Sequence, residues 1–182
     1  MTSRLYQLDS QPTQQNHNDT KFYSSFRVKR LSAEALLDAV NEVTGSPTKF
    51  PGLPLGTRAI ELPDSNYADQ FLVTFGKPRR ASVCECERSA EENLSQALHT
   101  LNGDILSTKI GNPQGRIGQL LKAKSPHEQI VSELYLATLC RPPSPAEVEA
   151  SRRFLQGSPS PQECYQDLLW ALVNSKHFLF VR

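Results

Sequence analysis

The sequence predicts a mainly α fold, with a helical bundle in the C-terminal half and a long Pro/Gly-rich irregular segment before it. Three observations lead to this prediction. The pattern Ser-Pro-Xaa-Glu occurs three times in the last third of the chain, and each copy opens an amphipathic run. Residues 45–64 hold four prolines and three glycines, a density that excludes a regular helix. Just before that segment, apolar residues recur at the spacing of a helix face.

The N-terminal half is predicted to contain few regular elements. Residues 1–25 are rich in Gln, Asn, Asp, Ser and Thr, so we expect an extended polar arm that lies over another surface. A helix is predicted from Ser32, a suitable N-cap, to Val43, and Gly45 is suited to end it. Residues 66–75 predict a short helix closed by a glycine, with a strand as the open alternative.

We expect the helical bundle to span residues 89–182. Ser89 and Glu92 form a capping box, in which each side chain accepts a hydrogen bond from the other residue's backbone N–H. Asp104 is then expected to cap a short helix, and residues 116–121 to add a turn or two. The whole chain, 1–182, is interpreted as one domain.

The three Ser-Pro-Xaa-Glu copies begin at Ser125, Ser144 and Ser160. In each copy serine supplies the N-cap, proline fits the first helical position and glutamate closes the box. The connections between the runs are short, which favours antiparallel neighbours. The side chains expected to face the core are Ile130, Val131, Leu134, Leu139, Val148, Phe154, Leu155, Tyr165, Leu168, Leu169, Trp170, Leu172 and Phe178.

Composition and missing motifs exclude several functions. The chain has 20 basic and 19 acidic side chains, a net charge of +1, so we expect no nucleic-acid partner. No apolar run is long enough to span a bilayer, and the start of the chain carries no export signal. The sequence contains neither a phosphate-binding loop nor a nucleophile elbow nor a haem-attachment motif, and no cofactor is predicted.

His127 is expected to be solvated.

The residues that could carry chemistry gather in one segment. Cys84 and Cys86 alternate, so on an extended chain both sulfurs would share a face. They could bind one soft metal ion, form a local disulfide or remain structural thiols, and the structural interpretation is preferred. Glu87 and Arg88 follow directly, and His99 stands at the edge of the next apolar stripe, which completes a candidate site.

Several motifs together resemble one family, the planctomycete-type domain of unknown function 1553. The most distinctive is Cys84-Glu85-Cys86-Glu87-Arg88-Ser89. The others are Ser3-Arg4-Leu5-Tyr6-Gln7-Leu8, the run from Arg30 to Ala39, Phe50-Pro51-Gly52-Leu53-Pro54, Gly56-Thr57-Arg58-Ala59, Phe75-Gly76-Lys77-Pro78-Arg79-Arg80, Gln96-Ala97-Leu98-His99, Leu134-Tyr135-Leu136-Ala137, the run from Arg141 to Glu147, and the run from Asp167 to Lys176. The resemblance covers nearly the whole chain.

This resemblance implies the C-terminal part of a large exported, multidomain bacterial protein, and it supplies no catalytic residues. Family members begin with a helical stretch before Thr2, so we expect this chain to be a truncated piece whose uncovered apolar surface meets other domains of the parent protein, or a separately encoded upstream part. The first functional hypothesis is therefore an accessory or interaction module. A polysaccharide ligand would suit that setting, although no sequence feature indicates one. The alternative is an enzyme fragment, or a metal or redox site, centred on residues 84–88.

Overall fold

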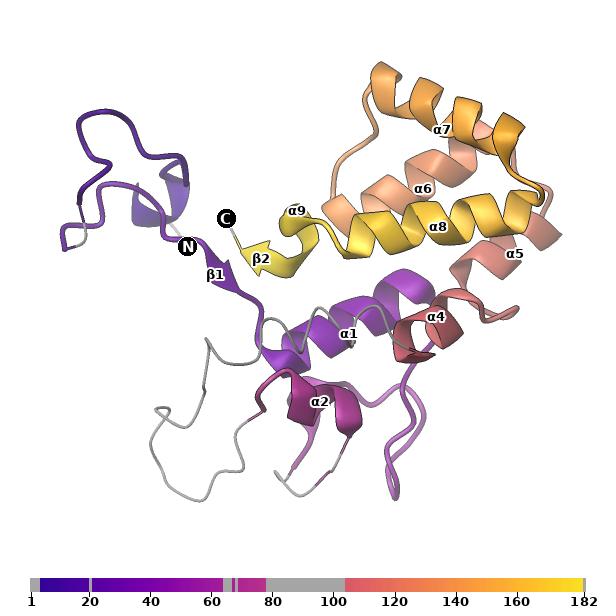
Figure 1. Cartoon of the computed structure of the whole chain (residues 1–182). Coiled ribbons are helices and arrows are strands. Elements are labelled where there is room, and N and C mark those ends of the chain that lie inside the picture. Colours follow the sequence, from indigo (N-terminus) through magenta and orange to yellow (C-terminus); the bar gives the residue numbers. More distant parts are fainter. Residues whose placement is uncertain (1–3, 20, 64–66, 68, 78–103, 182) are drawn as a thin grey trace.

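The structure is a computed structural model that describes residues 4–19, 21–63, 67, 69–77 and 104–181 (Figure 1). In chain order its elements are the 3-10 helix η1 (Arg4–Gln7), β1 (Lys29–Arg30), α1 (Ala33–Thr44), the 3-10 helix η2 (Ala59–Glu61), α2 (Gln70–Thr74), α4 (Asp104–Ile110), α5 (Arg116–Lys122), α6 (His127–Leu139), α7 (Pro145–Gly157), α8 (Pro161–Val173), α9 (Lys176–Leu179) and β2 (Phe180–Val181). The protein is mainly helical, as predicted, and the described part contains one two-stranded sheet. Within that part, every helix is too short or too polar to cross a membrane.

Helix α1 is the centre of the described fold. The Ser32 side chain accepts a hydrogen bond from the Ala35 N–H, and Gly45, in the left-handed conformation, ends the helix. Leu36 and Leu37 are almost completely buried, and α1 contacts η2, α2, α4, α5 and α6. The predicted helix from Ser32 to Val43 is therefore confirmed to within one residue at each end.

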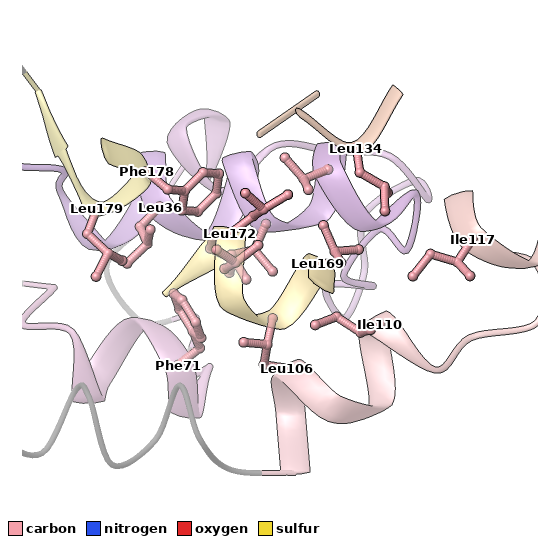
Figure 2. Packing of buried hydrophobic residues seen from close by; sticks show 14 of the residues in the cluster. Leu36, Phe71, Leu106, Ile110, Ile117, Leu134, Leu169, Leu172, Phe178 and Leu179 are labelled. Carbon is pink, nitrogen blue, oxygen red and sulfur yellow. The ribbon is translucent and has the colours of Figure 1, made fainter. Parts of the chain in front are cut away.

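One hydrophobic core in the described part of the chain is formed by side chains of η2 and of α1, α2, α4, α5, α6, α8 and α9. Leu36 of α1, Phe71 of α2, Leu106 of α4 and Leu169 and Leu172 of α8 all belong to this cluster (Figure 2). Helices α5, α6 and α9 contribute Ile117, Leu134, Phe178 and Leu179 to the same cluster. Residues from both halves of the chain thus share a single core.

The Pro/Gly-rich segment packs against α1 without forming a long regular element. The buried Asp38 carboxylate accepts hydrogen bonds from the backbone N–H groups of Ala59 (2.6 Å) and Ile60 (3.2 Å). These bonds fix the first turn of η2, where backbone N–H groups lack partners within the helix. The short helix α2 follows, capped by Asp69, so the helical alternative for residues 66–75 is confirmed and the strand alternative is wrong.

The segment just before α1 and the C-terminal end of the described chain meet in the small sheet. Strands β1 and β2 are antiparallel, with Lys29 opposite Val181 and Arg30 opposite Phe180. The guanidinium of Arg30 also donates to the Phe75 carbonyl (3.0 Å). This pairing closes the fold beside α9 (Figure 1).

Only one of the three predicted Ser-Pro-Xaa-Glu caps forms completely. At Ser144 the capping box is present in both directions. Ser160 is the N-cap of α8, but its side chain makes no capping hydrogen bond, because its backbone has a more extended φ of −142°. The prediction is wrong for Ser125, since α6 begins after Pro126.

Ser125 fails as an N-cap because it belongs to the end of the preceding helix. Lys124 has a positive φ of 52°, and its N–H donates to the Leu121 carbonyl (3.0 Å) while the Ser125 N–H donates to the Leu120 carbonyl (3.1 Å). These two bonds are the Schellman arrangement that closes an α-helix. Asp104 likewise lies within α4 and not before it.

Two side chains predicted for the core are exposed instead. Trp170 is 39 % exposed, because the buried face of α8 is formed by Tyr165, Leu169, Leu172 and Val173, and Trp170 lies outside that face. Phe154 is 50 % exposed, because α7 lies at the outside of the bundle (Figure 1), where Ser151, at 8 % exposed, is its only buried residue.

Candidate interaction groove

The candidate site predicted from the sequence, which comprises Cys84, Cys86, Glu87, Arg88 and His99, lies outside the described residues. Its metal, disulfide and structural alternatives therefore stay predictions. Metal analysis of the purified protein, with and without Cys84→Ser, tests them: a bound metal ion that the substitution removes would establish the metal alternative.

The described part holds no group of three or more His, Cys, Asp and Glu side chains arranged to bind a metal ion. Cys140 and Cys164 are thiols without a disulfide partner among the described residues, one exposed and the other buried. Any metal site at residues 84–88 would need further ligands from elsewhere.

Lys109 of α4 connects three polar groups at the end of α1 and in the loop that follows it. Its ammonium group donates to Asn41 Oδ1 (2.7 Å), to the Ser46 carbonyl (2.8 Å) and to Thr48 Oγ1 (3.0 Å). Burial lowers the pKa of Lys109, and the charge of Asp69 raises it in part. All three ammonium hydrogens have acceptors, so the residue fastens the end of α1 and the following loop to α4.

Arg116 makes a similar connection at the other side of that loop. Its guanidinium donates to the backbone carbonyls of Val43 (2.8 Å) and Glu42 (3.0 Å), which end α1, and pairs with Glu133 of α6 (2.5 Å). Cationic side chains at a helix C-terminus satisfy carbonyls that have no partner within the helix. Arg116 thus joins α1, α5 and α6.

A cavity of about 700 Å³ opens beside α1 and is lined in part by Asp38, Glu42, Arg58 and Arg116. Asp38 and Arg116 are already engaged in the contacts that hold η2 and the end of α1. Arg58 lies 3.7 Å from Asp38, and its side chain is 63 % exposed. Opposite charges line this cavity in equal number, so it offers no preference for an anion or a cation.

A second cavity, of about 300 Å³, lies between α6, α7 and α8, and we call it the α7 groove. Its volume is at the low end of the range of about 300–1,000 Å³ for ligand clefts. Its walls are mostly apolar, and the side chains that line it are His127, Tyr135, Glu147, Ala150, Ser151, Phe154, Cys164, Tyr165, Asp167, Leu168 and Ala171.

Three polar side chains in the floor of the α7 groove join the three helices. The Nδ1 atom of His127 on α6 lies 3.0 Å from the hydroxyl oxygen of Tyr165 on α8. Its Nε2 atom lies 3.1 Å from the hydroxyl oxygen of Ser151 on α7. The Ser151 hydroxyl also donates to the Val148 carbonyl (2.7 Å). His127 is half-buried and its ring nitrogens contact α7 and α8, so the prediction that it is solvated is wrong.

The positions of the hydrogens follow from these contacts. A hydroxyl has one hydrogen, and that of Ser151 goes to Val148, so Ser151 accepts from the Nε2–H of His127. In the neutral ring, which burial favours, Nδ1 carries no hydrogen and accepts from the Tyr165 hydroxyl. Ser151 is without activation as a nucleophile, because its hydrogen points away from the imidazole.

Burial keeps the floor of the groove uncharged. It lowers the pKa of His127, as does the nearby Arg152 to a lesser extent, while Glu128 raises it. Burial also raises the pKa of the Tyr165 hydroxyl and of the Cys164 thiol, the latter with help from Asp167. A protonated, buried thiol is a poor nucleophile, so the arrangement is suited to binding and not to covalent catalysis.

The charged side chains that line the groove are both acidic. Glu147 binds the guanidinium of Arg141 through both oxygens (2.7 and 2.9 Å), and this pairing lowers its pKa to about 2. Asp167 lies on the exposed face of α8 next to the groove. After pairing of Glu147 with Arg141, Asp167 supplies the remaining negative charge of the lining.

Sequence reasoning missed this floor because its members are distant along the chain. Ser151 and Tyr165 are 24 and 38 residues from His127. Neither spacing is a known signal, and only the packing of α7 and α8 on α6 brings the three together. Phe154 on α7 was part of a predicted apolar stripe. The spacing of that stripe does not show which of its side chains another helix covers and which stay exposed to solvent.

Comparison with known proteins gives a family and no described relative. Residues 1–155 match the model of the family described as PSD1, protein of unknown function (DUF1553). No curated protein and no solved structure matches the chain. The match covers most of the chain and agrees with the resemblance carried by its motifs, so the protein belongs to the DUF1553 family of proteins of unknown function.

Proposed function

We propose that this protein is an accessory interaction module, and that the α7 groove receives an apolar side chain from another domain of the same exported, multidomain assembly. The observation that supports the proposal is the groove itself. It is an apolar cleft with an uncharged floor, flanked by the half-exposed Phe154 and by acidic side chains. An apolar anchor in a desolvated pocket is the usual centre of a protein–protein contact.

The charge of the groove defines the partner segment further. Glu147 is neutralised by Arg141, whereas Asp167 is exposed at the edge. A lysine or arginine next to the apolar anchor would pair with Asp167, and an acidic residue there would be repelled. We therefore propose a helical segment that presents one large apolar side chain with a basic residue within one turn of it.

Designed helical peptides test this proposal directly. The first peptide carries a leucine anchor flanked by lysine, the second the same anchor flanked by glutamate, and the third alanine in place of leucine. Binding is measured by fluorescence anisotropy, and its location by NMR shift changes of Ala150, Leu168 and Ala171. We expect the lysine-flanked leucine peptide to bind best and to lose affinity when salt screens the charges.

Two matched variants separate the groove from the rest of α7. Ala150→Trp fills the groove from its lining, and Ala146→Trp adds the same side chain at an exposed position of α7 that does not line it. We expect Ala150→Trp to abolish peptide binding and Ala146→Trp to leave it unchanged. Equal binding of the lysine and glutamate peptides, or binding that survives Ala150→Trp, would contradict the proposal.

A further inference from the structure

We propose that a second copy of this chain occupies the α7 groove: the Phe22 side chain of one molecule docks in the groove of another. The inference rests on the groove chemistry of the proposed function, an apolar anchor beside a basic residue. It adds a partner that competes for the groove with the helical segment. Phe22 is 87 % exposed, the largest value among the large apolar side chains of the described part.

The loop that carries Phe22 is closed at its base and cross-linked inside. We call the described residues from Asp9 to Phe26 the Phe22 loop. At its base the Phe26 N–H donates to the Asp9 carbonyl (3.0 Å), and inside it the Asn16 amide donates to the Ser24 carbonyl (3.2 Å). Compact loops whose ends lie close together are frequently functional.

One carboxylate fixes the tip of the Phe22 loop. Asp19 accepts hydrogen bonds from the backbone N–H groups of Lys21 (2.9 Å) and Phe22 (2.7 Å). It also accepts from the N–H and the hydroxyl of Ser24 (2.9 and 2.6 Å). Tyr23 lies among these residues at a positive φ of 53°, which costs free energy in a bulky side chain. Because the tip is already held in one conformation, Phe22 loses little conformational freedom when it docks.

The exposed charges beside Phe22 are basic. Lys21 precedes it and is exposed, and the guanidinium of Arg27 lies over the Tyr23 ring, 5.0 Å from its centroid. Asp19 lies at the tip as well, but its two oxygens accept the loop's own hydrogens. The tip therefore presents an aromatic anchor with a lysine directly beside it.

The α7 groove supplies the complementary features. Its walls are mostly apolar and suit a phenyl ring, and the half-exposed Phe154 lines it and offers an aromatic neighbour. Asp167 lies at the edge of the groove, where Lys21 of the second molecule would pair with it. The contact thus joins an apolar anchor to a cleft and a positive charge to a negative one.

The anchor must come from another molecule. Figure 1 shows the Phe22 loop to the left of β1 and α7 to the right of α9, with the small sheet and α9 between them. The bond between Phe26 and Asp9 keeps the loop beside β1, which begins at Lys29. Two molecules that exchange loops would form a closed pair, whereas contacts repeated in one direction would form chains.

Sedimentation velocity and NMR on the full chain test the contact. We expect the wild-type protein to associate as its concentration rises, and the NMR signals of Ala150, Leu168 and Ala171 to shift over the same range. Phe22→Ala should weaken the association about tenfold or more, because the burial of a phenylalanine side chain is lost. Leu55→Ala should leave it unchanged, since Leu55 is 68 % exposed in another loop and does not line the groove.

Two variants that each lack one half of the contact should complement each other. Phe22→Ala keeps the groove and loses the anchor, whereas Ala150→Trp keeps the anchor and fills the groove. Each variant alone should associate weakly. Unlabelled Ala150→Trp protein, added to isotope-labelled Phe22→Ala protein, should shift the groove signals of Leu168 and Ala171.

Charge reversal in the same mixture tests the pairing at the groove edge. Lys21→Glu in the added protein should weaken binding to the labelled protein, because Asp167 then repels the loop. Asp167→Lys in the labelled protein should restore binding to that variant. Loss of binding without this restoration would contradict the proposed pairing.

The outcomes separate this inference from the proposed function. A wild-type protein that stays monomeric at NMR concentrations, or association that Phe22→Ala leaves unchanged, would overturn the inference. Binding of the lysine-flanked leucine peptide would still support the proposed function in that case. Association through Phe22 without any peptide binding would support the inference and contradict the helical partner. If both occur, the peptide should displace the second molecule, and a peptide that binds without displacing it would overturn the shared groove.

Discussion

Replacing Lys109 by methionine should destabilise the protein substantially. Methionine keeps a long apolar side chain but removes the ammonium group that donates to Asn41, Ser46 and Thr48. Asn41 Oδ1 keeps a hydrogen bond from Thr48 (2.9 Å), whereas the Ser46 carbonyl loses the partner that Lys109 provides. A hydrogen bond from a charged group contributes about 1.5–3 kcal/mol. The Ser46 carbonyl is only partly buried, so its loss of a donor costs less than the about 1–3 kcal/mol of a fully buried acceptor.

These contributions overlap and are offset by the desolvation of the ammonium group, so we expect a total loss of about 2–4 kcal/mol. Urea unfolding followed by circular dichroism measures it, and with a typical slope the midpoint should fall by about 1 M or more. Lys49→Met is the matched control, because Lys49 is an exposed lysine of the same loop. Equal midpoints for the two variants would refute the reasoning.

Three further substitutions test local features by the same unfolding assay. Gly118→Ala places a methyl group against the backbone of Pro113 and should lower the free energy of unfolding by about 1–3 kcal/mol. Gly157→Ala is the control, because its added carbon meets nothing within 4 Å, and it should leave the free energy of unfolding unchanged. Equal effects of the two substitutions would contradict the contact with Pro113. Lys124→Gly should stabilise the protein by about 0.5–1 kcal/mol, because Lys124 adopts a positive φ of 52° that glycine accepts without strain. A loss of stability in this variant would argue against the left-handed conformation at Lys124. Glu147→Gln should lower stability by about 1 kcal/mol or less at neutral pH. Because the pKa of Glu147 falls from 4.5 to about 2 on folding, that deficit should disappear as the pH falls toward 2, and a deficit independent of pH would show that the charge is not involved.

The helices whose signals are local could be predicted from the sequence. For α1, the cap at Ser32, the spacing of the buried leucines and the terminal Gly45 all lie within the element itself. The end of α5 shows the limit of such signals. Ser125 suits both the end of one helix and the start of the next, and the left-handed backbone at Lys124 decides between them.

The exposed faces could not be predicted, because they depend on which helix has a neighbour on both sides. Phe154 and Trp170 lie on amphipathic helices, yet both face outward where no other described element covers them. The floor of the α7 groove was missed for a related reason. A histidine beside a helix start is usually solvated, and only the distant Tyr165 and Ser151 give His127 its partners.

The antiparallel pairing of β1 with β2 has a consequence for how the chain acquires its structure. Strand β1 near residue 30 finds its partner only at residues 180–181, and α1, which packs on η2 and α2, is also contacted by α4, α5 and α6 from after residue 103. During synthesis the first strand must therefore wait for its partner, and part of the apolar face of α1 stays uncovered, until the later helices leave the ribosome. Assistance from a chaperone would matter most in that interval.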